Sequence, residues 1–297
     1  MSREPEPARA ALHERGAAEP GRATAEVVAR LRSAGCVFAE DEAGVLLSSV
    51  GSQTELDAWV ARRVAGEPLE QIVGWAQFCG LRIAVRPGVF VPRLRTELLV
   101  REAATLLRQA RAVRGGSGGE RPVVVDLCCG SGAVGVALAV LAGPVEVHAA
   151  DLDPAAVDCA GSTLAGLAAM AGDRSTGQAY LGDLFEPLPP RLRGTVDALV
   201  VNAPYVPTAQ IALMPPEARL HEPITALDGG PDGLDVARRA VAAAPDWLAP
   251  GGQMLVETSA RQAPALRELM AAAGLPARVV SDSDLDATAV IGWRPRP

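Results

Sequence analysis

The stretch that decides the fold is residues 123–135, VVVDLCCGSGAVG. It opens with three valines, as a buried strand does. It then forms a loop with Gly130, Gly132 and Gly135 before an apolar segment of helical character. Glycines in a loop between a strand and a helix let the backbone approach a bound ligand closely. The stretch therefore predicts the first strand and helix of an α/β domain, with a ligand site at the glycine loop.

Downstream of this stretch, predicted strands and helices alternate. Strands are expected at residues 145–150, 178–181, 196–201, 254–257, 277–280 and 288–293, and helices from residue 133 and at 154–169, 232–248 and 263–273. This alternation is typical of a parallel sheet covered by helices on both faces.

Upstream, the pattern is different. Residues 24–64 are helical in periodicity, and Ser52 with Glu55 forms a capping-box signature. A strand is expected at 81–85, a helix at 96–113, and a flexible linker at 114–120, RGGSGGE. We expect a disordered tail over 1–20, an N-terminal helical domain over 21–80, a connecting hairpin, helix and linker over 81–119, and the α/β domain over 120–297.

The composition excludes several classes of function. The chain has 297 residues, and its 28 basic residues, all arginine, face 35 acidic ones to give a net charge of −7. An acidic chain lacks the field on which non-specific nucleic-acid binding depends, so direct nucleic-acid binding is not expected. The absence of lysine excludes a lysine Schiff base and a P-loop lysine.

The cysteines and the N-terminus bear on location. The five cysteines form no CxxC pair and no metal-binding spacing with histidine, so reduced thiols and no metal are expected. The first twenty residues lack the apolar segment of a signal peptide, and no apolar run is long enough to span a bilayer. We expect a cytoplasmic protein without a membrane partner.

Two aspartates near the glycine loop bear on the choice of ligand. Asp126 precedes Gly130, and Asp151 ends the next predicted strand. A carboxylate at Asp126 would repel the pyrophosphate of a dinucleotide, whereas the sulfonium and ammonium groups of S-adenosylmethionine are cationic. S-adenosylmethionine is therefore the expected cofactor, with Asp151 placed to bind ribose hydroxyls. The alternative for Asp126 is a structural cap on the loop.

The tetrapeptide Asn202-Ala203-Pro204-Tyr205 follows the apolar run 196–201 and is expected at the same edge of the sheet as the glycine loop. The Asn202 side-chain oxygen and the Ala203 carbonyl can accept both hydrogens of a planar NH2 group, and Tyr205 can pack against its plane. Held in this way, the nitrogen has a localised lone pair and can attack a methyl group in line. A plain Asn-x-Pro turn is the alternative.

The chain resembles the HemK/PrmC family of release-factor glutamine methyltransferases. Asn202 to Tyr205 is similar to that family's Asn-Pro-Pro-Tyr signature. The resemblance runs from about residue 24 to residue 293 and includes GEPLEQIVG (66–74), FVPRLRTELLV (90–100), GDLFEPL (182–188), HEPITALDGGPDGLD (221–235) and PGGQMLVE (250–257).

The resemblance implies a Rossmann-like S-adenosylmethionine-dependent methyltransferase with a small N-terminal helical domain that recognises a protein substrate. It implies methylation of a glutamine side-chain amide in the Gly-Gly-Gln motif of a release factor. By position, it implies cofactor contacts from Cys128, Cys129, Gly130, Ser131, Gly132, Asp151, Asp183, Leu184 and Asn202, and substrate contacts from Asn202, Ala203, Pro204 and Tyr205. The stretch 92–97 would line the site, while the roles of Glu97, Glu222 and Glu257 stay open.

The chain departs from the family pattern at three places. Ala203 replaces a proline but keeps its carbonyl, so we expect activity to survive. Cys128 and Cys129 stand where the loop usually starts, and Arg95 replaces an acidic residue. These departures suggest a divergent branch, so the resemblance fixes the chemistry better than the target.

Three other functions remain open from the sequence. An adenine amino-methyltransferase on DNA or RNA would use the same tetrapeptide, although the net charge and the 3% aromatic content argue against it. A non-catalytic module that binds S-adenosylmethionine would not need Asn202 and Tyr205. A nicotinamide dehydrogenase has no supporting residues beyond the glycine loop.

Overall fold

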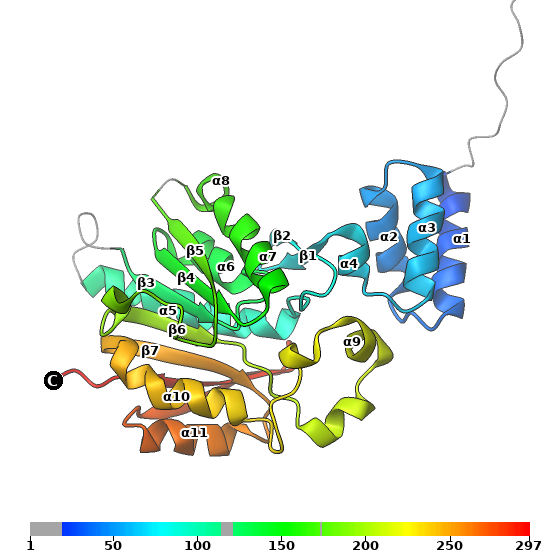
Figure 1. The fold of residues 1–297 in the computed structure, drawn as a ribbon. Helices are drawn as coiled ribbons and strands as arrows, with labels where there is room; N and C mark the ends of the chain where they lie inside the picture. The colour runs from blue at the N-terminus through cyan, green and yellow to red at the C-terminus, as the bar shows by residue number, and fades with distance from the viewer. Residues whose placement is uncertain (1–19, 114–120, 173) are drawn as a thin grey trace, which may run out of the picture. The chain divides into compact units, whose positions relative to one another are not determined.

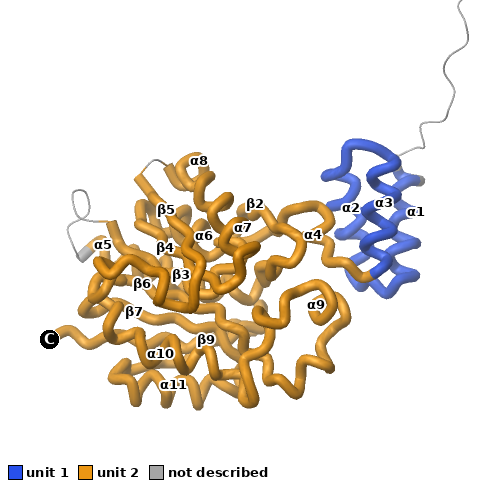
Figure 2. The backbone as a smooth tube through the Cα atoms, viewed as in Figure 1, with its two compact units in different colours: residues 1–65 blue, residues 66–297 orange. Residues whose placement is uncertain are grey.

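The structure, a computed structural model, describes residues 20–113, 121–172 and 174–297. The chain divides into two compact units, residues 1–65 and 66–297 (Figure 2). The tail expected over 1–20 lies outside the described residues except for Pro20, and so does the linker expected over 114–120. The described ranges contain no helix with the length and apolar character needed to cross a bilayer.

The described part of the first unit consists of α1 (Pro20–Ser33), α2 (Ala39–Ser49) and α3 (Gln53–Val64). Its core is made of aliphatic side chains, among them Val27, Leu31, Leu46, Leu56 and Val60. Ser52 caps α3, since its hydroxyl accepts a hydrogen bond from the Glu55 N–H at 3.3 Å. This confirms the predicted Ser52 cap, whereas Glu55 accepts from the Gly51 N–H at 2.9 Å and not from the Ser52 N–H that a capping box uses.

The second unit is built on a seven-stranded sheet in the order β5-β4-β3-β6-β7-β9-β8 (Figure 1). The first five strands in this order run parallel, and β9 is antiparallel to both of its neighbours. The strands are β3 (Val123–Leu127), β4 (Glu146–Asp151), β5 (Thr176–Leu181), β6 (Val196–Val201), β7 (Leu248–Thr258), β8 (Ala277–Asp282) and β9 (Ala287–Trp293). This mostly parallel sheet confirms the predicted α/β class.

Helices cover both faces of the sheet because its strands are apolar on both sides. Val124 and Val200 join one core cluster, and Val125 and Val201 join the other. The first cluster is shared with α5 (Glu97–Val113), α6 (Ala133–Ala142), α7 (Pro154–Ala165) and α8 (Leu167–Ala171), and the second with α10 (Asp235–Trp247) and α11 (Ala263–Ala272). Continuous apolar strands of this kind are expected where both faces are buried.

Three features differ from the sequence-based expectations. A hairpin of β1 (Trp75–Phe78) and β2 (Leu81–Ala84), preceded by α4 (Leu69–Val73), belongs to the second unit, because Phe78 and Ile83 are fully buried in its core. The helix expected at 154–169 is interrupted at Gly166. The segment after β6 forms short helices that were not expected: η3 (Thr208–Leu213), α9 (Pro216–His221) and η4 (Ile224–Ala226).

Two helical glycines provide a matched test of the packing. A Cβ at Gly135 in α6 would lie 2.7 Å from Val147 Cγ1, whereas a Cβ at Gly161 in α7 would meet nothing within 4 Å. Alanine stabilises a helix by about 1 kcal/mol relative to glycine. Forcing an extra methyl group into a well-packed core lowers stability by about 1–3 kcal/mol. We expect Gly161→Ala to raise the free energy of unfolding in urea and Gly135→Ala to lower it. Equal effects of the two substitutions would contradict this packing.

Candidate active site

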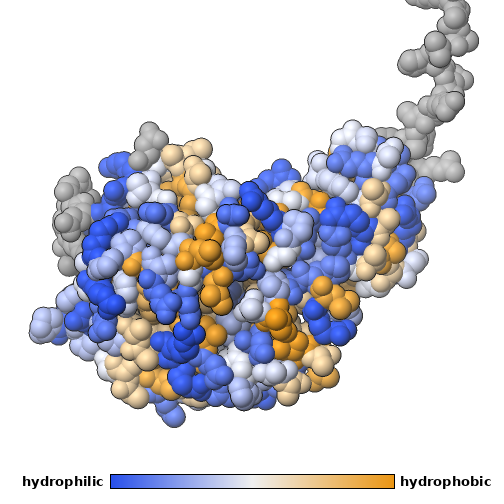
Figure 3. All heavy atoms as spheres, viewed as in Figure 1, coloured by the Kyte–Doolittle hydropathy of each residue, from blue (hydrophilic) through white to orange (hydrophobic). Residues whose placement is uncertain are grey.

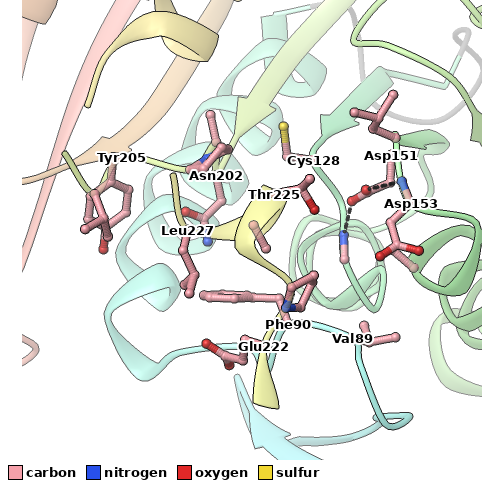
Figure 4. Close-up of a pocket in the computed structure, with 18 of the residues that line it drawn as sticks. Val89, Phe90, Cys128, Asp151, Asp153, Asn202, Tyr205, Glu222, Thr225 and Leu227 are labelled. Atoms are coloured by element: carbon pink, nitrogen blue, oxygen red, sulfur yellow. Dashed lines mark hydrogen bonds between the residues drawn. The ribbon is translucent and has the colours of Figure 1, made fainter. Parts of the chain in front are cut away.

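A cavity of about 550 Å³ opens at the carboxyl ends of β3, β4 and β6, within the second unit (Figure 4). This is where open α/β sheets bind ligands, and the volume suits a small molecule. Nine of the predicted site residues line the cavity: Cys128, Gly130, Asp151, Asp183, Leu184, Asn202, Ala203, Pro204 and Tyr205. In Figure 4, Asp151 and Tyr205 lie at opposite ends of the drawn pocket, with Asn202 and Cys128 between them.

Asp151 ends β4 and holds the glycine loop. Its Oδ2 accepts a hydrogen bond from the Gly130 N–H at 2.9 Å, and its Oδ1 accepts from the Asp153 N–H at 3.0 Å (Figure 4). Each carboxylate oxygen has two lone pairs, so both can accept a further bond from the cavity. Burial raises the pKa of Asp151, against the effect of these two bonds.

Asp126 is 1% exposed and does not line the cavity. Its Oδ2 accepts a hydrogen bond from the Gly135 N–H at 3.1 Å, near the start of α6. Burial raises the pKa of Asp126 to about 7. This geometry favours the capping role that the sequence left open. Direct contact of Asp126 with a cofactor stays a prediction, as do those of Cys129, Ser131 and Gly132, which also lie outside the lining.

Asn202 and Ala203 present two acceptors at the end of β6. The Asn202 Nδ2 donates to Thr96 Oγ1 at 3.3 Å. The other polar atom of this amide, the acceptor Oδ1, takes no part in that bond. No residue in the described ranges donates a hydrogen bond to Asn202 Oδ1 or to the Ala203 carbonyl. Both residues line the cavity, so a planar NH2 group there would find two unused acceptors.

Tyr205 is held by its hydroxyl. The hydroxyl donates to Glu257 Oε1 at 3.1 Å and accepts a hydrogen bond from the Arg95 guanidinium at 3.5 Å. Burial raises the pKa of Tyr205 to about 12, so its side chain is neutral near pH 7. Its backbone carbonyl accepts from Gln262 Nε2 at 3.0 Å.

A glycine-rich loop supports the tetrapeptide from behind. The Val206 N–H donates to the Leu227 carbonyl at 3.0 Å, and the Gly229 N–H donates to the Val206 carbonyl at 2.9 Å. Gly233 has φ +77°, and a Cβ there would lie 2.3 Å from the Tyr205 carbonyl oxygen. Only glycine therefore allows this loop to pack against the tetrapeptide.

Comparisons with known proteins agree with this geometry. A family model described as the methyltransferase small domain matches residues 96–219. The chain is 41% identical over 204 residues to the release factor glutamine methyltransferase of Geobacter sulfurreducens, covering 69% of this chain and 65% of that one. It is 34% identical over 275 residues to the corresponding protein of Deinococcus radiodurans, covering 86% of this chain and 92% of that one. The chain belongs to the release factor glutamine methyltransferase family.

This membership confirms the family predicted from the sequence. The fold is also similar to the crystal structure of a methyltransferase from Pyrococcus furiosus, with a TM-score of 0.51 at 15% identity, covering 79% of this chain and 97% of that one. The predicted Rossmann-like methyltransferase fold is thereby confirmed.

The three glutamates left open by the sequence have different surroundings in this family member. Glu97 accepts a hydrogen bond from the Cys79 N–H at 2.7 Å and does not line the cavity. Glu222 lines it, and its Oε1 accepts from the Val91 N–H at 3.2 Å and from Arg93 at 2.5 Å. Glu257 lies behind Tyr205, outside the lining.

Several lining residues were not among the predicted site residues. They come mainly from the segment before α5 and from the short helices after β6: Val89, Phe90, Met214, Glu217, Thr225 and Leu227. Arg93 and Arg95 also line the cavity, as expected for the stretch 92–97. In the described ranges, no three His, Cys, Asp or Glu side chains gather as metal ligands.

Proposed function

We propose that this chain transfers a methyl group from S-adenosylmethionine to the side-chain amide nitrogen of a glutamine, in the Gly-Gly-Gln motif of a peptide chain release factor. The observation that carries the proposal is the pair of unused acceptors, Asn202 Oδ1 and the Ala203 carbonyl, in one cavity with Asp151. The proposal includes the cytoplasmic location expected from the sequence.

The residues around the glycine loop fit S-adenosylmethionine. The lining carries five carboxylate side chains against three arginines, and Arg239 is paired with Asp183 at 2.5 Å. The remaining excess of negative charge, with Asp151 and Asp153 beside the glycine loop, suits a cationic ligand better than an anionic pyrophosphate. Asp151 has lone pairs left for ribose hydroxyls, while Asp183 and Leu184 line the part proposed for the adenine. When bound, S-adenosylmethionine supplies a methyl group activated by a positively charged sulfur.

The chain's own residues bind and orient the glutamine. Asn202 Oδ1 and the Ala203 carbonyl accept the two amide hydrogens and so weaken the delocalisation of the nitrogen lone pair into the carbonyl. The neutral Tyr205 ring packs beside the amide plane. Catalysis then rests on positioning and electrostatics, which need neither lysine nor a reactive thiol.

A protein substrate is supported by the surface near the cavity. Figure 3 shows apolar side chains over the segment around α9, where Leu213, Leu220 and Ile224 are exposed, Leu213 by 83%. The same segment lines the cavity through Met214 and Ala218. Exposed apolar residues beside a cavity are typical of protein-binding surfaces.

The test is incubation of the full chain with methyl-labelled S-adenosylmethionine and a bacterial release factor. We expect label on the release factor and none on a variant whose Gly-Gly-Gln glutamine is replaced by glutamate. Adenine-containing DNA and RNA serve as parallel substrates. Label on adenine in place of the release factor would contradict the proposal and favour an adenine methyltransferase.

A further inference from the structure

Glu257 is a buried carboxylate behind the tetrapeptide, at the end of β7. It is 4% exposed and does not line the cavity, so it is not placed to touch a substrate. Its Oε1 accepts the Tyr205 hydroxyl at 3.1 Å, whereas its Oε2 is buried without a hydrogen-bond partner in the described ranges. A buried carboxylate oxygen without a donor is costly, so a nearby proton donor is expected to serve it.

The hydroxyl available for this is that of Thr96, which is 2% exposed. Burial raises the pKa of Glu257, and the neighbouring Thr96 and Tyr205 hydroxyls lower it. Thr96 Oγ1 also accepts from Asn202 Nδ2 at 3.3 Å. Thr96 is therefore a neighbour of both Asn202 and Glu257, and the hydrogen bond from its hydroxyl to Glu257 Oε2 is the step that our proposal adds.

The direction of these bonds follows from the number of protons. A threonine hydroxyl has one proton to donate, and an ionised carboxylate can only accept. If Thr96 donates to Glu257, its oxygen can only accept from Asn202. The Asn202 amide must then turn its NH2 toward Thr96 and its oxygen toward the cavity, which is the orientation that binding a substrate NH2 group requires.

We propose that Glu257 is a positioning residue for methyl transfer, which fixes the direction of the Asn202 amide through the Thr96 hydroxyl. The proposal rests on the proposed function, because the Asn202 oxygen must face the substrate amide. Glutamine at position 257 can donate to Thr96, whose proton then points toward Asn202. With the Thr96 proton pointing toward it, the Asn202 amide is expected to turn its oxygen to Thr96 and its NH2 group to the cavity. The NH2 group then faces the hydrogens of the substrate amide, which it cannot accept.

The test compares Glu257→Gln, Thr96→Val and the double variant by steady-state kinetics on the release factor. We expect each single variant to lower kcat by roughly 10- to 100-fold, less than the direct loss of a catalytic hydrogen bond, with KM for S-adenosylmethionine nearly unchanged. Because both residues act through one relay, the double variant should lose no more than the worse single variant. If the fold-losses of kcat in the two single variants multiply in the double variant, the proposal is overturned.

The controls separate this proposal from its premise. Glu268→Gln, an exposed change on α11, should have wild-type kinetics, and thermal melting with calorimetric cofactor binding checks that each variant is folded. If Glu257→Gln does not fold, Thr96→Ser and Thr96→Val test the relay in its place. Serine keeps the hydroxyl, so kcat should fall much less in Thr96→Ser than in Thr96→Val. Equal losses would overturn the relay. Failure of the wild-type chain to methylate the release factor would instead overturn the proposed function.

Discussion

Replacing Asn202 with alanine should lower kcat for release-factor methylation by about 100- to 1000-fold, as expected for the loss of one preorganised hydrogen-bonding group. The variant keeps the Ala203 carbonyl but loses the other acceptor, so the substrate nitrogen is held by one hydrogen only. Asn202 makes no hydrogen bond to the glycine loop among the described residues, so cofactor affinity should change little. Steady-state kinetics and calorimetry with S-adenosylmethionine measure the two effects separately.

Gln109→Ala is the matched control for Asn202→Ala, because it removes an exposed amide on α5. It should leave both kcat and cofactor affinity at the wild-type values. A loss of cofactor affinity in Asn202→Ala as large as its loss of kcat would contradict the assigned role, since it would make Asn202 a support for the cofactor loop.

Replacing Asp151 with alanine should weaken S-adenosylmethionine binding by about 10- to 150-fold, which corresponds to roughly 1.5–3 kcal/mol for hydrogen bonds to a charged group. The substitution removes the proposed ribose acceptors and also the acceptor that holds the Gly130 N–H at 2.9 Å. Both losses act on the cofactor end of the cavity. Titration calorimetry of the folded variant measures the effect.

Asp158→Ala provides the comparison for Asp151→Ala, because it removes an exposed carboxylate on α7 and changes the net charge equally. We expect its affinity for S-adenosylmethionine to match the wild type. If Asp151→Ala bound as tightly as Asp158→Ala, the cofactor would have to lie elsewhere in the cavity.

Local signals explain which parts of the fold could be predicted from the sequence. The strand, loop and helix around Gly130 follow from neighbouring residues, and the edge of the sheet at which Asn202 lies follows from strand direction. The short strand β1 has only four residues, too few for periodicity to identify. The helix α9 has only six residues, beginning at Pro216, and is too short for a helical periodicity to identify.

The contacts within the site could not be predicted from the sequence, because they join residues far apart along the chain. Thr96 and Asn202 are separated by 106 residues, and Glu222 reaches Arg93 across 129, so only the folded chain brings these pairs together. The sequence also showed Asp126 beside the glycine loop but not its burial, which decides between capping the loop and facing a ligand. The chemistry of its residues and the family resemblance both pointed to the tetrapeptide, and the structure added the residues that orient it.

The central claim is that the cavity holds a glutamine amide by both of its hydrogens. Tandem mass spectrometry of a release factor methylated to completion tests it most directly. The account predicts a single methyl group on the side-chain nitrogen of one glutamine and no second methyl, because a methylated amide has one hydrogen left for two acceptors. Two methyl groups on that nitrogen, or a methyl group on any other atom of the release factor, would contradict it.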